Sequence, residues 1–244
     1  MSGENHLKLS LVIPCYNEEK NIPLLIKKYK NFLKDKKNEI ILVNNGSTDN
    51  SNKVFKKLKK YRNIRIINVK KNIGFGYGLK KGLFKAKGKS ILYSHADMEI
   101  DPKDVLRSIK IFNNKKNKIK NEYFIKGNRT DKRKNYWSWN DIFFSWSLTI
   151  ISTLLFRQFL FDIHGQPVLF PRKMLKEIKY FPNDFSIDLA FYVHAKKNNY
   201  QIIRFPLNFN KRKRYFGIGS SSTINKKIKA SLEQLYQCFK ILFN

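Results

Sequence analysis

Residues 89–102 read KSILYSHADMEIDP, an apolar run that passes into a cluster of acidic side chains. The first part is typical of a buried strand, and the residues from Pro102 onward are typical of a helix. Open α/β sheets bind their ligands beyond the carboxyl ends of such strands. Asp97 and Glu99 offer carboxylate oxygens, which Mg²⁺ prefers together with the phosphates of a substrate. The stretch therefore predicts a metal–diphosphate site, although the same residues would also serve as an ordinary helix start.

Apolar, β-branched runs alternate with helix-like segments through the first half of the chain. Strands are predicted at residues 8–13, 39–43, 64–69 and 89–94. Helices are predicted at about 18–34, from a cap at 47–49 through 58, and from a glycine-rich turn at 72–78 through 86. Repeated β-α units with apolar strands are typical of a mostly parallel sheet flanked by helices. We therefore predict an α/β fold.

The second half of the chain has a less regular pattern. It predicts a helix from Pro102 and strands at 123–126, 168–170 and 201–205. Further helices are expected near 172–178 and 186–197. An apolar, aromatic stretch spans 136–161, and residues 223–243 have the spacing of an amphipathic helix. Because no repeat or linker divides the chain, we expect a single domain.

The composition limits the class of protein. Hydrophobic residues make up 42% of the 244 residues, which is typical of a globular domain. The net charge of +32 favours a polyanionic neighbour such as nucleic acid, an anionic membrane or a phosphate-bearing substrate, although evenly spread lysines also fit a solvated surface. No nucleic-acid-reading motif is found, so no specific nucleic-acid partner is expected. The two separated cysteines indicate a reducing compartment, and we expect no signal peptide because the apolar run at 9–13 is short.

Two other predicted strands end in residues suited to a nucleotide. Pro14 stops the first strand, Tyr16 offers an aromatic face to a base, and Glu18 can accept hydrogen bonds from a ribose or a base edge. Asn45 ends the second strand, and its amide can both donate to and accept from a nucleobase. The same residues are also explained by a strand end, an Asn-Gly turn and helix caps, so both interpretations stay open.

A third strand is followed by the turn that contains Gly74, Gly76 and Gly78. Glycine lets the backbone approach a ligand closely. However, the spacing of these glycines differs from the dinucleotide-binding fingerprint, which also follows the first strand of its unit. We therefore do not expect NAD binding.

These signatures together resemble those of the family 2 glycosyltransferases, which have the GT-A fold. The resemblance covers about residues 9–221 and rests on VIPCYNEE at 12–19, VNNGSTD at 43–49, NIG at 72–74 and HADME at 95–99. The polyprenyl-phosphate branch, which includes dolichyl-phosphate mannose synthase-like enzymes, is also similar in KGNR at 126–129, DIHGQP at 162–167 and RYFG at 214–217. The resemblance implies a Rossmann-like GT-A domain at 7–221, with a nucleotide-binding half at 7–101 and an acceptor half at 102–221. A C-terminal amphipathic helix at 222–244 would follow it.

The resemblance also implies site residues. Asp97 matches the position whose carboxylate meets the metal in the family, and Glu99 replaces the usual glutamine, so Mg²⁺ or Mn²⁺ is the expected cofactor. His95 replaces an aspartate of the family's metal motif, and it is expected to hydrogen-bond the diphosphate or to favour Mn²⁺. Asn45 stands where the family usually has an aspartate that contacts the nucleobase, so the identity of the nucleobase stays open. Nucleotide-sugar contacts are implied for Pro14, Tyr16, Glu18, Asn45, Asn72, Gly74, His95 and Asp97.

The family inverts the anomeric centre in a single displacement, so the departing nucleoside diphosphate must be stabilised. Arg129 and Arg214 are expected to contact phosphate. A hydroxyl acceptor would need a base, for which Asp188 is the candidate, whereas a lipid phosphate is already ionised. Asp188 is also explained as an acid at a helix N-terminus.

The function expected from this resemblance is transfer of a sugar from a nucleotide-diphosphate sugar to a polyprenyl phosphate or another membrane-linked acceptor, as in cell-envelope glycan synthesis. Two alternatives stay open. The first is a transferase that acts on a hydroxyl of a glycan or glycolipid. The second is a catalytically weakened protein that binds nucleotide-sugars or polyanions.

Two segments raise the question of a membrane. The tryptophans of residues 136–161 suit a membrane interface, but Asp141 and Arg157 interrupt the stretch, so an interfacial helix and a buried core helix are both consistent. The C-terminal helix, with lysines at 226, 227 and 229, fits a helix lying on anionic lipid, packing against the domain, or a homo-oligomer contact. We expect a cytoplasmic protein that associates peripherally with the cytoplasmic face of a membrane.

Overall fold

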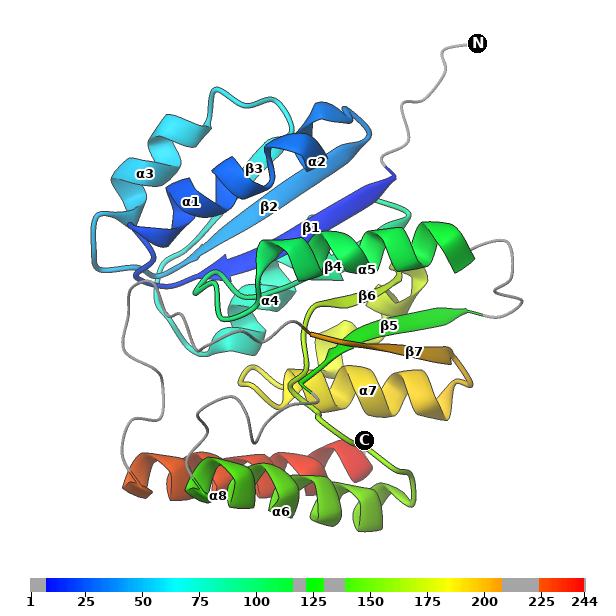
Figure 1. Ribbon diagram of the computed structural model, residues 1–244. Coiled ribbons are helices and arrows are strands. Elements are labelled where there is room, and N and C mark those ends of the chain that lie inside the picture. Colours follow the sequence, from blue (N-terminus) through cyan, green and yellow to red (C-terminus); the bar gives the residue numbers. More distant parts are fainter. Residues whose placement is uncertain (1–7, 116–121, 130–138, 208–223, 244) are drawn as a thin grey trace.

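Among the described residues, a seven-stranded sheet forms the centre of the molecule, in the order β3-β2-β1-β4-β6-β5-β7 (Figure 1). The structure is a computed structural model, which describes residues 8–115, 122–129, 139–207 and 224–243. The strands are β1 (Leu9–Cys15), β2 (Asn38–Asn45), β3 (Ile64–Val69), β4 (Ser90–Tyr93), β5 (Tyr123–Asn128), β6 (Val168–Pro171) and β7 (Gln201–Pro206). The α-helices are α1 (Asn21–Lys28), α2 (Lys30–Lys34), α3 (Ser51–Leu58), α4 (Phe75–Leu83), α5 (Pro102–Lys115), α6 (Trp139–Phe156), α7 (Ile187–Lys197) and α8 (Ile224–Leu242).

The sheet is mixed and mostly parallel, which confirms the predicted fold class. β1 pairs in parallel with β2 and β4, and β2 pairs in parallel with β3. β6 runs antiparallel to β4 and to β5, and β5 is parallel to β7. Because β1, β2 and β4 run in one direction, their carboxyl ends at Cys15, Asn45 and Tyr93 fall at the same edge of the sheet.

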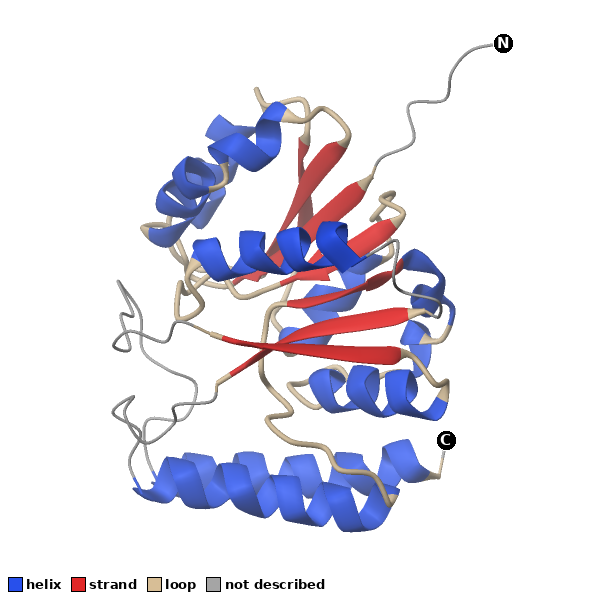
Figure 2. Ribbon diagram, turned by 45° about the vertical axis from the view of Figure 1, so that its right-hand side comes forward, coloured by secondary structure: helices blue, strands red, loops and turns tan. Residues whose placement is uncertain are grey.

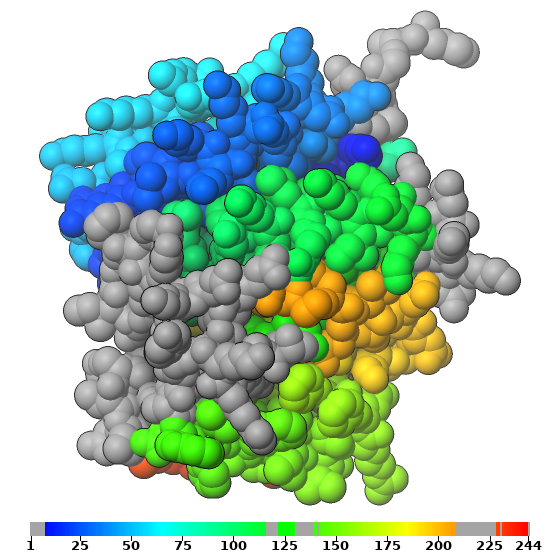
Figure 3. Space-filling view, in the orientation of Figure 1, coloured from blue at the N-terminus to red at the C-terminus, as the bar shows by residue number. Residues whose placement is uncertain are grey.

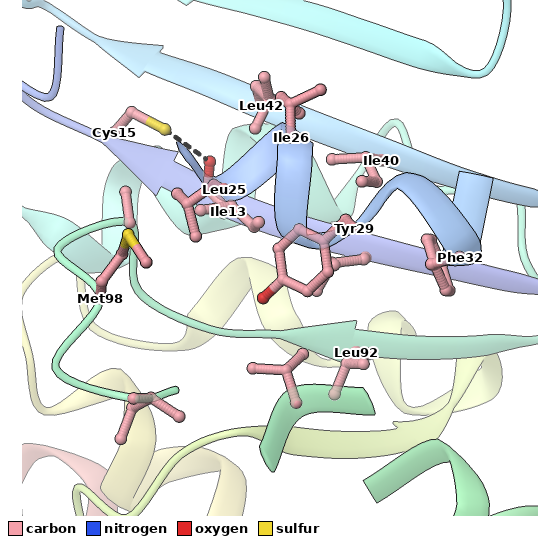
Figure 4. Close-up of a cluster of buried hydrophobic side chains, with 14 of the residues drawn as sticks. Ile13, Cys15, Leu25, Ile26, Tyr29, Phe32, Ile40, Leu42, Leu92 and Met98 are labelled. Atoms are coloured by element: carbon pink, nitrogen blue, oxygen red, sulfur yellow. Dashed lines mark hydrogen bonds between the residues drawn. The ribbon is translucent and has the colours of Figure 1, made fainter. Parts of the chain in front are cut away.

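Side chains of the central strands alternate between two apolar layers, as the pleat requires. Leu11 and Ile13 of β1 belong to the layer beneath α1, α2, α3 and α5, part of which Figure 4 shows. Val12 belongs to the opposite layer, together with residues of α4 and α7. Both faces of the sheet are therefore covered, which explains why its central strands are mostly apolar.

The structure corrects several predicted boundaries. The helix expected at 18–34 is divided into α1 and α2 at Tyr29, where the chain bends while both Tyr29 and Phe32 stay buried. α4 begins at Phe75, inside the turn predicted at 72–78, and ends at Leu83 instead of residue 86. Gly74, just before it, has a φ of +128° that no helix contains, and this fixes the start. The helix expected near 172–178 is instead two short 3₁₀ segments, η1 (Arg172–Lys176) and η2 (Ile178–Tyr180).

α6 and α8 lie side by side as a separate layer, next to α7 and away from the central strands (Figures 1 and 2). α6 accounts for most of the apolar stretch at 136–161, and α8 corresponds to the predicted C-terminal helix. In the described part of the chain, no helix combines the length and the apolar character that crossing a bilayer requires.

Candidate active site

The segment after β1 and the segment after β2 are locked together at the carboxyl edge of the sheet. Asn17 has a left-handed φ of +57°, and its Oδ1 accepts hydrogen bonds from the backbone N–H groups of Thr48 (2.8 Å) and Asp49 (3.3 Å). Asn17 thus bridges two loops, and its side chain does not cap α1. Next to it, the Glu18 carboxylate accepts a hydrogen bond from the Asn21 amide (2.6 Å). Tyr16 is 45% exposed at this edge, so its ring is accessible to a ligand.

Asn45 is buried beneath the turn at 72–74. Its Nδ2 donates to the carbonyl oxygen of Gly74 (3.1 Å) and to Oδ1 of Asn72 (3.3 Å), and Asn72 Oδ1 also accepts from the Gly74 N–H (3.0 Å). Asn45 Oδ1 has no hydrogen-bond partner among the described residues. A buried acceptor without a partner costs about 1–3 kcal/mol. Asn45 therefore supports the turn that contains Asn72 and Gly74, and it carries an acceptor that a donor group could satisfy.

The glycine-rich turn approaches the protein's own backbone closely. A Cβ added at Gly76 would lie 2.6 Å from the carbonyl oxygens of Pro182 and Asp184. The Tyr77 N–H donates to the Asn183 carbonyl oxygen (2.8 Å), and the Lys80 ammonium group donates to the Phe181 carbonyl oxygen (2.6 Å). The start of α4, in the predicted nucleotide-binding half, thus packs directly against the 181–184 segment of the acceptor half.

Asp97 and Glu99 follow β4 at the same edge, and both are half-buried. Asp97 Oδ1 accepts the Glu99 N–H (3.0 Å), and Met98 between them has a left-handed φ of +59°. Within the described ranges, no three His, Cys, Asp or Glu side chains gather into a metal site built from protein alone. Two carboxylates nevertheless suit Mg²⁺, which usually takes one or two from the protein and its other ligands from water and substrate phosphates.

His95 lies in an aromatic group. Its ring centroid is 4.7 Å from that of Phe75, and Phe75 stacks on Phe185 at 5.0 Å. These rings come from the segment after β4, from α4 and from the loop before α7, so they meet where the two halves adjoin. The ring of His95 therefore faces the acceptor half, and its charge contributes to the electrostatics of Asp188.

Asp188 is 3% exposed and is surrounded by hydrogen-bond donors. Its carboxylate accepts from the Tyr93 hydroxyl (2.7 Å) and from the Gln166 amide (3.2 and 3.3 Å), and it lies 3.3 Å from His164 Nδ1. Burial alone would raise the pKa of Asp188. The hydrogen bond and charge of His164 outweigh it, with help from His95 and Tyr93, and hold the pKa below its ordinary value. Asp188 is therefore an ionised carboxylate whose acceptor positions are occupied by protein groups.

Arg129 and Asp162 form a second buried charge network. Arg129 donates to Asp162 through its backbone N–H (2.7 Å), Nε (2.8 Å) and Nη2 (2.6 Å), while Asp162 is 1% exposed. Lys126 donates to the backbone carbonyl oxygens of Asp162 (2.7 Å) and Ile163 (2.9 Å). Burial lowers the pKa of Lys126 to about 7, although the charge of Asp162 partly opposes the shift. These contacts fix the 162–166 segment against β5.

Gln234 of α8 connects the hydrogen bonds around Asp188 to the outer helices. Its amide nitrogen lies 3.0 Å from Nε2 of His164, whose other ring nitrogen faces Asp188. Sequence reasoning did not single out Tyr93, Gln166, Lys126 or Gln234 as site residues. Lys126 and Gln166 stand in motifs that the resemblance does quote, whereas no pattern marks Gln234. The expected site residue Arg214 lies outside the described residues.

The site residues fall into two groups. The first group lies at the ends of β1 and β2 or on the segments that follow β1, β3 and β4: Pro14, Tyr16, Glu18, Asn45, Asn72, Gly74, His95, Asp97 and Glu99. Arg129 and Asp188 lie on the other side of the joint made by α4 and the 181–184 segment. The edge formed by the carboxyl ends of β1, β2 and β4 is suited to a diphosphate. Buried, paired charges lie beside it.

Comparison with known proteins identifies this arrangement. Residues 10–179 match the family described as glycosyl transferase family 2. A human dolichyl-phosphate beta-glucosyltransferase is 36% identical over 100 residues, which cover 37% of this chain and 31% of the relative. An undecaprenyl-phosphate 4-deoxy-4-formamido-L-arabinose transferase of Proteus mirabilis is 28% identical over 134 residues, covering 53% of this chain and 39% of the relative. These matches thus span only about a third to two-fifths of the relatives' length.

A solved structure shows the same fold. It is glucosyl-3-phosphoglycerate synthase from Mycobacterium tuberculosis in complex with Mn²⁺, UDP-glucose and phosphoglyceric acid, with a TM-score of 0.69 and 12% identity, covering 96% of this chain and 79% of that one. At this identity the likeness concerns the fold alone. The family match, in contrast, extends over more than half of the chain. The chain therefore belongs to glycosyltransferase family 2, whose members with this GT-A-like fold are nucleotide-sugar glycosyltransferases.

Proposed function

We propose that this enzyme transfers a sugar, with inversion at the anomeric carbon, from a nucleotide-diphosphate sugar to a polyprenyl phosphate or another membrane-linked acceptor. The proposal rests on one observation: two buried carboxylates on the acceptor side already accept hydrogen bonds from protein groups. Asp188 is 3% exposed and Asp162 is 1% exposed, and both are held by donors from the protein. A hydroxyl acceptor needs a base that can reach its proton, whereas a phosphate is already ionised. Buried, occupied carboxylates therefore favour a phosphate acceptor.

The relatives support the same acceptor class. The human relative is named a dolichyl-phosphate beta-glucosyltransferase, and the relative from Proteus mirabilis is named an undecaprenyl-phosphate transferase. Both names contain a polyprenyl phosphate. Because a polyprenyl chain is confined to a bilayer, we place the enzyme in the cytoplasm, at the cytoplasmic face of an anionic membrane.

On the donor side, we assign the nucleotide to the carboxyl edge of β1 and β2. The exposed ring of Tyr16 would stack on the base, and Glu18, beside it, would accept hydrogen bonds from the ribose or the base. The unpartnered Oδ1 of Asn45 would accept a hydrogen bond from a donor group on the base, provided that the turn at 72–74 opens. Asn72 and Gly74, which form this turn, would then border the nucleotide.

Next to the nucleotide, Asp97 and Glu99 would hold Mg²⁺ or Mn²⁺, which supplies positive charge to the departing diphosphate. Manganese is present in the glucosyl-3-phosphoglycerate synthase complex that shares this fold. His95 would donate a hydrogen bond to a diphosphate oxygen. Arg129 contributes charge that is already paired with Asp162, so we assign it to shaping the acceptor side, and we assign phosphate contact to Arg214.

A transfer assay tests the proposal. Purified protein is given UDP- and GDP-sugars with Mg²⁺ or Mn²⁺, together with a polyprenyl phosphate or the matching polyprenol in detergent, and products are identified by mass spectrometry. We expect the sugar on the phosphate only, and measurable turnover in Asp188→Asn because no proton has to be removed.

Two other outcomes would contradict the proposal. Transfer to a hydroxyl that Asp188→Asn abolishes, while donor binding stays intact, would establish the hydroxyl-acceptor alternative. Donor binding without turnover under either metal would establish a weakened nucleotide-sugar binding protein.

A further inference from the structure

The polarity of α6 is inverted relative to a helix on the surface of a water-facing domain. Its exposed side chains are almost all large and apolar: Trp139 (85%), Phe143 (66%), Trp146 (46%), Ile150 (55%) and Leu154 (72%). Its small polar residues are buried instead. Thr149 and Ser152 are 3% and 0% exposed, and their hydroxyls donate back to the carbonyl oxygens of Ser145 (3.0 Å) and Leu148 (2.6 Å).

The exposed apolar residues of α6 form one continuous stripe. They follow one another at intervals of four, three, four and four positions, which places them on one face of a helix. Another face already packs on the domain, since Phe156 is buried in the core layer and Leu148 and Leu155 lie against it. The outward stripe is therefore not needed to fold the chain. Figure 3 shows α6 (green to yellow-green) at the lower edge of the molecule.

α8 carries a second stripe of the same kind, next to α6 (Figures 1 and 2). Ile228 (44%), Leu232 (61%), Tyr236 (64%) and Phe239 (49%) are exposed at intervals of four, four and three positions. Cys238, on the inner side, is fully buried. Lys229 and Lys240 are exposed on the same helix. Exposed apolar surface of this extent is unusual for a protein that stays in water, and it marks an interaction site.

We propose that the outward stripes of α6 and α8 form a docking surface that lies in the interfacial region of an anionic lipid bilayer, parallel to its plane. The two tryptophans of the α6 stripe belong to the residue type that gathers at membrane interfaces. Exposed lysines beside the α8 stripe suit anionic headgroups. A second copy is a less favourable occupant because it also carries a net charge of +32, and like charges repel.

The docking surface extends the proposed function to the membrane. Its role in bringing a lipid-linked acceptor to the site rests on that proposed function. Gln234 of α8 contacts His164, and His164 contacts Asp188. The hydrogen-bonded segment at 162–166 is therefore attached to the helix that lies on the lipid. Docking would hold the acceptor side of the site at the headgroup level, where the phosphate of a lipid acceptor lies.

Vesicle flotation tests the docking surface. The full chain is mixed with vesicles of phosphatidylcholine alone or of phosphatidylcholine and phosphatidylglycerol in equal parts. The variant Phe143→Ser/Ile150→Ser/Leu154→Ser removes apolar groups from the stripe, and Phe84→Ser/Tyr180→Ser removes exposed apolar groups elsewhere (54% and 67% exposed). We expect the wild-type and control proteins to float with the anionic vesicles, and the stripe variant to bind at least about tenfold more weakly. Brominated lipids should quench tryptophan fluorescence in the wild type.

Two results would overturn the docking surface. One is equal flotation of the stripe variant and the wild type. The other is a lipid-free dimer, in sedimentation velocity, that the stripe substitutions dissociate, since a second copy would then cover the stripe. A circular dichroism melt shows whether the stripe variant is folded. If it is not, the three single variants are tested in its place. A transfer assay with a short-chain prenyl phosphate in solution distinguishes the two proposals. If the protein floats with vesicles but transfers no sugar, the docking surface is supported and the proposed function is contradicted.

Discussion

Tyr93 of β4 and Asp188 of α7 are joined by a buried hydrogen bond of 2.7 Å from the hydroxyl to Oδ1. β4 leads into the segment that contains Asp97, and α7 belongs to the acceptor half, so this bond connects the two halves of the site. Burial, the charge of Asp188 and the bond itself raise the pKa of Tyr93 well above its ordinary value. The phenol therefore stays protonated and donates throughout the neutral range.

The ionised state of Asp188 predicts acid sensitivity. Its folded-state pKa lies below the ordinary 3.8, so the carboxylate stabilises the fold above that value and loses this contribution as the pH falls through the folded-state pKa. We expect Asp188→Asn to cost about 1–3 kcal/mol at neutral pH, because the Tyr93 and Gln166 donors lose a charged partner. Urea unfolding from neutral pH downward should show the wild type losing stability more steeply than the variant. Parallel curves would contradict the assignment.

Lys126 predicts the same direction of pH dependence, in a higher pH window. Burial lowers its pKa to about 7 in the folded protein from the ordinary 10.5. Between these values the unfolded chain binds the extra proton, so the free energy of unfolding should rise with pH in that window. The difference in unfolding free energy between wild type and Lys126→Met should therefore grow in favour of the wild type from pH 7 to about pH 10. A constant difference would show that the ammonium group is not desolvated.

The pairing of Arg129 with Asp162 predicts strong coupling between them. Removing the guanidinium in Arg129→Met leaves a carboxylate that is 1% exposed without its charged partner, which should cost about 3–5 kcal/mol of stability. The double variant Arg129→Met/Asp162→Asn should recover part of that loss, since the buried carboxylate that Arg129 pairs with is removed as well. Denaturant unfolding of the four proteins completes the double-mutant cycle, and additive losses would exclude the coupling.

The tight contact at Gly76 predicts that a larger side chain will not fit where α4 meets the 182–184 segment. Its added Cβ would lie 2.6 Å from two backbone carbonyl oxygens, so Gly76→Ala must push the 182–184 segment away from α4. We expect a loss of about 1–3 kcal/mol in unfolding free energy. Lys81→Ala, at an exposed position of the same helix, should be near neutral. If both variants unfold alike, the contact is not tight.

Much of the donor side could be predicted from the sequence. The central strands are mostly apolar because both faces of the sheet are covered, so their positions and a mostly parallel sheet could be predicted from the pattern. Parallel strands bring their carboxyl ends to one edge, which placed Tyr16, Asn45 and Asp97 at the same side of the sheet. The start of α4 could not be read in this way, since it depends on the φ of Gly74 and on contact with residues 182–184.

The acceptor side was less predictable because its contacts join residues far apart in the chain. Gln234 is 70 positions from His164, and no periodicity marks either residue. The exposure of α6 was equally hidden. An apolar stretch has the same composition whether its outer face is buried or exposed, and only the structure shows that Phe143 and Leu154 are exposed while Thr149 and Ser152 are buried.

We propose that the carboxyl edge of the sheet binds a nucleotide-diphosphate sugar through Asp97 and a divalent cation. Thermal unfolding with UDP- and GDP-sugars, with and without Mn²⁺ or Mg²⁺, tests it most directly, because a ligand of the native state raises the melting temperature. We expect a metal-dependent rise with one nucleotide, retained in the control Asp101→Asn and lost in Asp97→Asn. An equal rise in Asp97→Asn, or no rise with any donor, would contradict it.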